Sequence, residues 1–248
     1  MIRDLKALWR SVRIYRLNRS HQQSLRELYQ PFVSEGSSVV FDIGAHAGDR
    51  TACFKALGAT VVSIEPQPWF ARLLKLNHLL SSKVTVLRCV VSDTDGPKVL
   101  RVNSRNPTVS TLSDDFVQAA TDGGVGWQGQ QWDRRITVPA VTVDALIARF
   151  GMPAFIKIDV EGAELDVLSG LSSPPSALSF EFTMIQPKLV VDCIERCATL
   201  GLSRFNVSLG ESHQLTFETW LDAAALIEYL STLPPEANSG DVYARREV

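Results

Sequence analysis

Residues 39–48 (Val-Val-Phe-Asp-Ile-Gly-Ala-His-Ala-Gly) join an apolar strand to a turn that contains two glycines. Gly44 and Gly48 allow the backbone to turn sharply and to approach a ligand closely. The helix expected after the turn directs free backbone N–H groups at the same ligand. The pattern predicts a cofactor site with the candidate residues Asp42, Gly44, Ala45, His46 and Gly48.

Two cofactor classes use such a turn, and two residues distinguish them here. A dinucleotide site needs Gly-x-Gly-x-x-Gly so that the backbone can approach a pyrophosphate. His46 stands at the second glycine position, where its side chain would obstruct a pyrophosphate. Asp42 at the strand end would repel phosphate, but it suits the cationic ammonium of a methionine moiety. These departures favour S-adenosylmethionine over NAD.

A carboxylate follows the next expected strand, in Ser-Ile-Glu-Pro at residues 63–66. A carboxylate at this position can accept hydrogen bonds from both ribose hydroxyls of a bound nucleoside. The alternative is that this glutamate is a solvated acid in a turn, with no contact to a ligand. Its place at the end of the neighbouring strand favours the ribose role, so Glu65 and Pro66 are candidate cofactor contacts.

The end of the third expected strand supplies candidates for adenine. Backbone groups around Cys89 and Val90 are the first choice, with Ser92 and Asp93 as alternatives. Asp93 lies in a turn-rich stretch, where an aspartate also caps turns through its own side chain. The adenine contacts therefore stay open between these two pairs.

Residues 156–164 (Ile-Lys-Ile-Asp-Val-Glu-Gly-Ala-Glu) place charges at a strand end and a helix start. Ligands of open α/β sheets bind at such strand ends, so Asp159 and Glu161 are candidates to bind substrate or act as a base. Helix capping is the alternative for Asp159, and a favourable charge in the first turn explains Glu164. Neither explains Lys157, for which function and a structural ion pair remain open.

Glu181 adds another carboxylate at the end of a fifth strand. Asp159, Glu161 and Glu181 are the predicted catalytic residues, with Asp159 the first choice for the base. Together their oxygens are also suited to a divalent cation. The metal requirement stays open, because sequence separation does not show that the three side chains converge.

Strands alternating with helices after Pro31 predict parallel strands joined by crossovers. Residues 136–143 also look extended. Seven strands with intervening helices predict an α/β, three-layer, doubly wound domain. The expected strands are 38–43, 60–64, 84–91, 154–158, 178–182, 203–207 and 241–244, and the expected helices are 49–57, 68–80, 144–150, 162–170, 188–199 and 218–232.

Two regions depart from this alternation. Residues 103–135 are polar and rich in glycine, and we expect a long loop inserted over the mouth of the active site. Residues 1–35 form a basic accessory region before the domain at 36–248. Residues 1–30 are compatible with a helix that meets an anionic membrane or an acidic substrate, but a helix packed on the domain is favoured.

The bulk properties exclude several classes of protein. A net charge of −2 argues against a nucleic-acid binder. The four cysteines lack the spacing of a disulfide scaffold or a cysteine zinc site, which favours reduced thiols and a cytoplasmic location. Apolar runs of roughly 18–20 residues, as a membrane span requires, do not occur. The beginning of the chain shows no signal-peptide pattern.

Five motifs in order resemble the FkbM family of methyltransferases over residues 37–185. The motifs are Val-Phe-Asp-Ile-Gly-Ala-His-Ala-Gly at 40–48, Ile-Glu-Pro at 64–66, Val-Ser-Asp-Thr-Asp-Gly at 91–96, Val-Pro-Ala-Val-Thr-Val-Asp at 138–144 and residues 156–164. Ser-Thr-Leu at 110–112 looks like a further short motif. The resemblance implies a class I methyltransferase (Rossmann-like) fold, mostly parallel with one antiparallel strand near the sheet edge. It also implies O-methylation of a hydroxyl on a sugar, glycan or other natural product.

The expected reaction is in-line attack of an acceptor oxygen on the sulfonium methyl group of S-adenosylmethionine. The expected partner is a small-molecule or glycan acceptor, without nucleic acid or a membrane span. Peripheral membrane contact through residues 1–30 and the oligomeric state stay open. Two alternatives are an NAD-dependent oxidoreductase on a similar fold and a noncatalytic module that binds a membrane or nucleic acid through residues 1–30.

Overall fold

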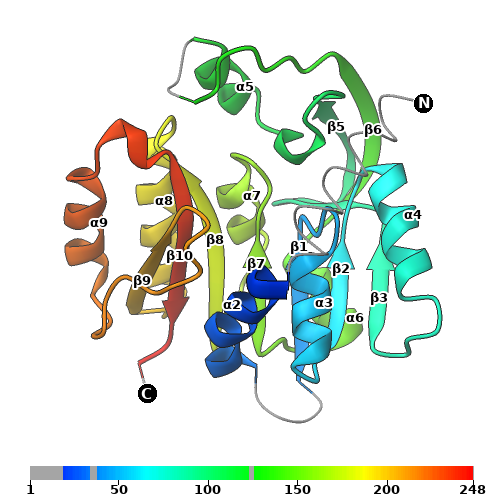
Figure 1. Cartoon of the computed structure of the whole chain (residues 1–248), viewed down its shortest axis with the longest axis horizontal. Helices are drawn as coiled ribbons and strands as arrows, with labels where there is room; N and C mark the ends of the chain where they lie inside the picture. The colour runs from blue at the N-terminus through cyan, green and yellow to red at the C-terminus, as the bar shows by residue number, and fades with distance from the viewer. Residues whose placement is uncertain (1–18, 34–37, 123–125, 248) are drawn as a thin grey trace.

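The computed structural model describes residues 19–33, 38–122 and 126–247. Seven strands form one sheet in the order β3-β2-β1-β7-β8-β10-β9 (Figure 1). Only β10 runs antiparallel to its neighbours, β8 and β9. The predicted doubly wound, mostly parallel sheet is confirmed, with its antiparallel strand beside the edge. The strands are β1 (Val39–Ile43), β2 (Thr60–Ile64), β3 (Val84–Leu87), β7 (Phe155–Ile158), β8 (Ala177–Thr183), β9 (Arg204–Leu209) and β10 (Ser239–Arg245).

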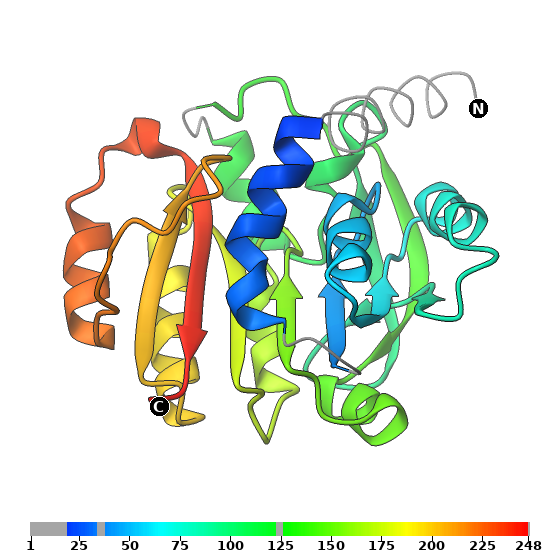
Figure 2. The same ribbon diagram turned by 60° about the horizontal axis from the view of Figure 1, so that its bottom comes forward.

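Helices cover both faces of this sheet, because its central strands are apolar on both sides. α2 (Arg19–Tyr29) and α3 (Asp49–Ala56) lie on one face, where Figure 2 shows α2 between α3 and β10. Leu25, Leu28 and Tyr29 form the buried stripe of α2. The opposite face packs against α6 (Val143–Phe150), α7 (Glu164–Ser169), α8 (Pro187–Thr199) and α9 (Ala223–Ser231).

A second sheet of three strands has the order β4-β6-β5. Its members are β4 (Val90–Val91), β5 (Gly96–Val102) and β6 (Arg134–Val141). The expected strand 84–91 is therefore wrong as one element, because the chain leaves the main sheet after β3 and enters the second sheet at β4. β5 was not predicted, because its initial Gly-Pro is typical of a turn. Its alternating burial fits a strand with one solvent-exposed face.

The segment between β5 and β6 has secondary structure of its own, which corrects the expectation of a long loop. It contains the 3-10 helix η3 (Pro107–Val109) and α5 (Asp114–Thr121). The Ser113 side chain caps α5 by accepting a hydrogen bond from the Phe116 N–H at 3.0 Å. Phe116 packs with Val109 and Trp127 in a small apolar cluster. Figure 1 shows α5 and β5 beyond the carboxyl ends of the parallel strands.

Several helices are shorter than expected. α4 (Pro68–Asn77) packs beside β3 and ends before the exposed Leu79 and Leu80. α9 begins at Ala223, because the Asp222 side chain accepts a hydrogen bond from the Ala225 N–H at 2.8 Å. The remaining short helices are η2 (Gln30–Phe32) and η4 (Pro235–Ala237).

The expected basic helix falls largely on residues 1–18, which lie outside the described residues. The part of the expected helix that the structure describes is α2, which packs on the main sheet. Among the described residues, none of the helices has the length and apolar character needed to cross a membrane. All four cysteines are buried and unpaired.

Candidate active site

A cavity of about 220 Å³ lies at the carboxyl ends of the parallel strands, where open α/β sheets bind ligands. Ten of the predicted site residues line it: Gly44, Ala45, His46, Glu65, Pro66, Cys89, Val90, Asp159, Glu161 and Glu181. Four predicted cofactor residues are not among the lining residues: Asp42, Gly48, Ser92 and Asp93. The structure therefore divides the candidates into residues that can touch a ligand and residues that support them.

Gly44 brings the turn after β1 against the end of β7. Its φ of 84° is in the left-handed region, and an added Cβ would lie 1.8 Å from the carbonyl oxygen of Asp159. The N–H groups of Gly44 and Ala45 both donate to the Ile64 carbonyl at 3.0 Å. Only glycine fits this approach.

Asp42 supports the turn from the interior of the fold. Its buried carboxyl group accepts a hydrogen bond from the Thr51 hydroxyl, and Thr51 Oγ1 lies 2.8 Å from Ser63 Oγ. Burial raises the pKa of Asp42 to about 6. The expected contact between Asp42 and a methionine ammonium is not supported, because the side chain faces α3 and β2. Gly48 is likewise structural, because it stands at the N-cap position of α3, where an added Cβ would lie 2.3 Å from Leu74.

Glu65 is buried at the end of β2, with both carboxylate oxygens held by backbone groups. Oε2 accepts from the His46 N–H at 3.0 Å, and Oε1 accepts from the Gln67 N–H at 2.7 Å. Burial raises the pKa of Glu65 to about 7. Each carboxylate oxygen has a further lone pair, so the group can still accept from two hydroxyls. A nucleoside ribose fits this arrangement.

His46 combines a backbone role with an aromatic contact. Its φ of 42° is unusual for a residue other than glycine, and this conformation directs its N–H at Glu65. The imidazole ring lies 4.0 Å from the Phe70 ring, between centroids. Burial lowers the pKa of His46 to about 4, so the ring is neutral near pH 7.

Of the two candidate pairs for the adenine contact, one lines the cavity and the other does not. Cys89 and Val90 line the cavity together with the apolar side chain of Leu100. Asp93 lies on the exposed turn that follows and accepts hydrogen bonds from Ser92 at 3.0 Å and Lys98 at 3.1 Å. Ser92 and Asp93 therefore stabilise a turn outside the cavity, which is the alternative that the turn-rich sequence left open.

Three carboxylates converge in the cavity, and we call Asp159, Glu161 and Glu181 the acidic cluster. One carboxylate oxygen of each lies within 4.8 Å of the others. Oε2 of Glu161 and Oε2 of Glu181 are buried without a hydrogen-bond partner among the described residues. Burial, followed by the charge of Asp159, raises the pKa of both glutamates well above the usual range. The acidic cluster can therefore hold protons or a cation.

Lys157 is fully buried beneath the acidic cluster. Its Nζ lies 2.6 Å from Asp241 Oδ1 and 3.4 Å from Asp159 Oδ2. Burial lowers the pKa of Lys157, but the two carboxylates outweigh burial and raise it overall. Lys157 thus forms the structural ion pair that was one of its two interpretations, and it positions the Asp159 side chain.

The sequence reasoning missed several residues of the cavity wall. Asp241 comes from the antiparallel strand β10, and Glu211 comes from the loop after β9. Arg50 is the only lysine or arginine among the lining residues of the described chain, and its Nη1 lies 2.9 Å from Asp49 Oδ2. The position of Asp49 and Arg50 directly after the glycine turn is the one signal that could have indicated them.

Comparisons with known proteins show which family the chain is similar to. The family described as "Methyltransferase FkbM domain" matches residues 42–233. The hexuronic acid methyltransferase AglP of Haloferax volcanii is 25% identical over 187 residues, 72% of this chain. The chain spans 66% of the length of that relative.

Solved structures of O-methyltransferases show a more distant similarity. The O-methyltransferase from Bacillus cereus in complex with SAH has 11% identity and a TM-score of 0.49, covering 99% of this chain and 91% of that one. A putative O-methyltransferase from Klebsiella pneumoniae has 10% identity and a TM-score of 0.47, covering 100% and 89%.

The family match includes the glycine turn, Glu65 and the acidic cluster, and it covers well over half of the 248 residues. It favours the methyltransferase interpretation over an NAD-dependent oxidoreductase and over a noncatalytic binding module. The protein belongs to the FkbM family of S-adenosylmethionine-dependent methyltransferases.

Proposed function

We propose that the protein transfers a methyl group from S-adenosylmethionine to a hydroxyl of a sugar-type acceptor. The observation that carries the proposal is the single cavity that joins the backbone-held carboxylate of Glu65 to the acidic cluster. A relative named as a hexuronic acid methyltransferase supports a sugar acid as the acceptor class. S-adenosylmethionine, when bound, supplies an electrophilic methyl group.

The proposed cofactor contacts follow from the cavity wall. Glu65 would accept from the ribose hydroxyls, and Cys89 and Val90 would contact adenine. The turn at Gly44 and Ala45 would face the methionine portion. Holding this portion beside the acidic cluster would place the methyl group next to the acceptor region, where transfer needs the reacting atoms at roughly 3–3.5 Å.

Asp159 is the proposed base. Its side chain is 26% exposed, whereas Glu161 and Glu181 have raised pKa values because of burial first and the charge of Asp159 second. Protonated glutamates are poor bases, so Asp159 is the member best suited to receive the hydroxyl proton. A hard divalent cation bound by the acidic cluster is the alternative way to activate the hydroxyl.

Arg50 is the proposed contact for an acidic acceptor. A guanidinium group binds a carboxylate through two parallel hydrogen bonds. Arg50 lines the cavity, and its Nη2 lies 4.0 Å from Oε2 of Glu211 in the loop after β9. This placement suits the carboxylate of a hexuronic acid.

Residues 103–135 are proposed to form a roof for the acceptor region, since Thr108, Ser110 and Leu112 line the cavity. The basic region at 1–35 remains a proposed accessory region to the domain at 36–248. We also propose a cytoplasmic location, which the four unpaired cysteines support.

The test measures transfer of isotope-labelled methyl groups from S-adenosylmethionine to a panel of hexuronic acids and matched neutral hexoses. We expect methyl ethers on uronic-acid hydroxyls, with weaker transfer to the neutral sugars. Arg50→Lys should reduce the preference for uronic acids, because lysine lacks the planar pair of donors. Equal transfer to both sugar series would contradict the role of Arg50. Transfer to neither would contradict the acceptor class.

A further inference from the structure

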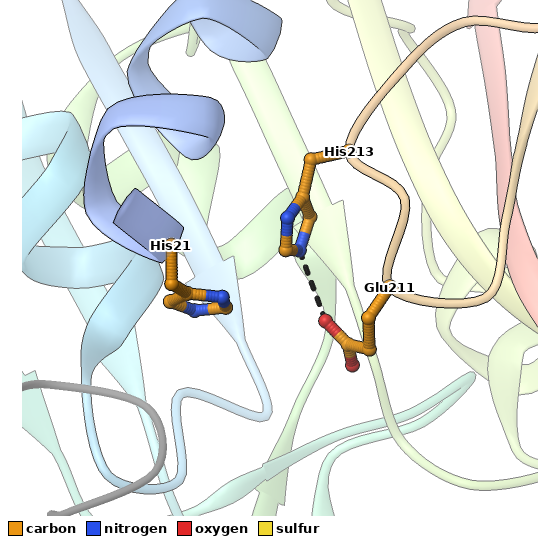
Figure 3. A group of neighbouring side chains, drawn as sticks. All are labelled: His21, Glu211 and His213. Atoms are coloured by element: carbon orange, nitrogen blue, oxygen red, sulfur yellow. Dashed lines mark hydrogen bonds and ion pairs between the residues drawn. The ribbon is translucent and has the colours of Figure 1, made fainter. Parts of the chain in front are cut away.

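A second group of ligand-type side chains lies beside the cavity, and we call His21, Glu211 and His213 the histidine cluster (Figure 3). His21 comes from α2, whereas Glu211 and His213 come from the loop after β9. One ring nitrogen of each histidine and one carboxylate oxygen of Glu211 lie within 4.8 Å of one another. Residues far apart in the sequence therefore converge at one point.

The histidine cluster is held in a defined geometry. His213 is only 8% exposed, and its φ of 53° lies in the left-handed region. Such a conformation is unfavourable for a residue other than glycine and is common at functional sites. His213 Nε2 lies 2.9 Å from Glu211 Oε2, as Figure 3 shows. The His21 and His213 rings meet edge to face, with centroids 4.8 Å apart.

Asp49 supports His21 from outside the histidine cluster. Its Oδ2 lies 3.1 Å from His21 Nε2. Histidines that bind metals usually donate their second ring N–H to a carboxylate, which fixes the tautomer and the ring orientation. His21 thus has a carboxylate partner at Nε2, and one of its two ring nitrogens lies within 4.8 Å of the ligand atoms of Glu211 and His213.

The local charge permits a cation despite a nearby guanidinium group. Arg50 Nη2 lies 4.0 Å from Glu211 Oε2, while Arg50 Nη1 lies 2.9 Å from Asp49. Asp49 and Arg50 pair with each other, so the carboxylate of Glu211 is a further acidic group beside the two imidazoles. Glu211 is also 63% exposed, which gives an ion access from solvent.

We propose that the histidine cluster binds a divalent transition-metal ion, with Zn²⁺ as the representative ion. Two imidazole nitrogens and one carboxylate match zinc, whose tetrahedral sites accept a water or a ligand at the fourth position. Imidazole ligands disfavour Mg²⁺ and Ca²⁺, which prefer oxygen. The two clusters beside the cavity therefore differ in the ions that they select.

The bound ion would connect α2 to one wall of the cavity. Gly210 and Glu211 line the cavity, and His21 anchors the site to the helix on the sheet face. An ion at this point would hold the loop after β9 against α2. The inference does not depend on the proposed base, because Asp159 lies in the acidic cluster.

The test uses full-length, tag-free protein stripped of metal and titrated with Zn²⁺ by calorimetry, with Mg²⁺ as the comparison ion. We expect one Zn²⁺ per chain in addition to any binding of Mg²⁺. His21→Ala and His213→Ala should each weaken the Zn²⁺ affinity by at least about 10–100-fold. Glu218→Gln, an exposed change in the same segment, is the matched control and should leave it unchanged.

Asp159→Asn separates this inference from the proposed function. The variant should retain Zn²⁺ affinity, because Asp159 belongs to the acidic cluster. Loss of Zn²⁺ binding in Asp159→Asn, with retention in both histidine variants, would overturn the proposal. A chain that binds no Zn²⁺ would also overturn it and would leave the methyltransferase activity untouched.

X-ray absorption at the zinc edge of the wild-type protein tests the ligands without any substitution that affects folding. We expect two imidazole ligands and oxygen neighbours, with Zn–N distances of about 2.0–2.1 Å. A shell of oxygen atoms alone would contradict ligation by His21 and His213. The Co²⁺-substituted protein should show visible absorption bands that disappear in His213→Ala.

Discussion

The acidic cluster lines the cavity, whereas the histidine cluster reaches the same cavity through Glu211. In each cluster, three ligand-type side chains lie within 4.8 Å of one another. The acidic cluster comes from the ends of β7 and β8, which are neighbours in one rigid sheet. The histidine cluster joins a helix before the sheet to a loop near the end of the chain. Burial of like charges suits the first to proton transfer or hard cations, whereas imidazole nitrogens suit the second to transition metals. The surroundings of each group, more than their spacing, decide their chemistry.

The largest expected effect comes from Asp159→Asn, which removes the proposed base and retains the side-chain size. We expect turnover to fall by about 10²–10⁴-fold, because general-base assistance is lost. The affinity for S-adenosylhomocysteine should change little. Methyl transfer at saturating acceptor, with calorimetry for cofactor affinity, measures both.

Asp115→Asn, on the exposed face of α5, is the matched control for loss of one aspartate. Undiminished turnover in Asp159→Asn would remove the proton-transfer role from the acidic cluster. If Mg²⁺ stimulates wild-type turnover and the variant abolishes this stimulation, the cation alternative gains support over direct proton transfer.

A smaller effect is expected from Glu65→Gln. In the wild-type protein, each carboxylate oxygen of Glu65 accepts a backbone N–H, from His46 or Gln67, and would also accept a ribose hydroxyl. The substitution replaces one of these two oxygens by an amide NH₂ group, which does not accept. We expect the affinity for S-adenosylhomocysteine to fall about 10-fold, equivalent to about 1.4 kcal/mol. Calorimetry of Glu65→Gln beside the exposed change Glu228→Gln tests this. Equal affinities in the two variants would place the nucleoside elsewhere.

The smallest expected effect concerns stability and pH. Burial first, and the charge of Asp159 second, raise the pKa of Glu181 in the folded protein. The folded state therefore binds more protons than the unfolded state, and stability falls as pH rises from the ordinary carboxyl range toward the raised pKa. Glu181→Gln removes this ionisation, so it should raise the melting temperature at pH 8 by about 2–4 °C.

The comparison at pH 5 completes this test, because burial raises the pKa of Glu181 and the gain from Glu181→Gln should shrink as the pH falls toward the ordinary carboxyl range. Glu218→Gln should show no such dependence on pH, since its side chain is exposed. A gain in melting temperature that is equal or larger at pH 5 would contradict the raised pKa of Glu181 in the folded protein.

Much of the main sheet could be predicted from the sequence. The buried strand before Gly44, the alternation of strands and helices, and the antiparallel strand implied by the family resemblance are all confirmed. The second sheet was largely missed, because β5 begins with a turn-like Gly-Pro and β4 has only two residues. Short strands of this kind depend on partners that local pattern does not indicate.

The sequence predicted those site residues that directly follow a strand, and it missed those whose position depends on contacts with distant segments. The turn after β1, Glu65 and Asp159 follow strands, and strand ends of a parallel sheet share one edge. Local pattern does not indicate the direction of the Asp42 side chain, which accepts a hydrogen bond from Thr51 in the following helix.

The sequence by itself determined the fold class, the glycine turn and the acidic residues that follow the strands, because each rests on local periodicity and backbone geometry. Tertiary structure alone decided that Asp241 pairs with Lys157 and that His21 meets Glu211 and His213. These contacts join residues far apart in the chain. They arise because burial of the apolar stripe of α2 and the pairing of β10 beside β8 bring distant segments together at the cavity.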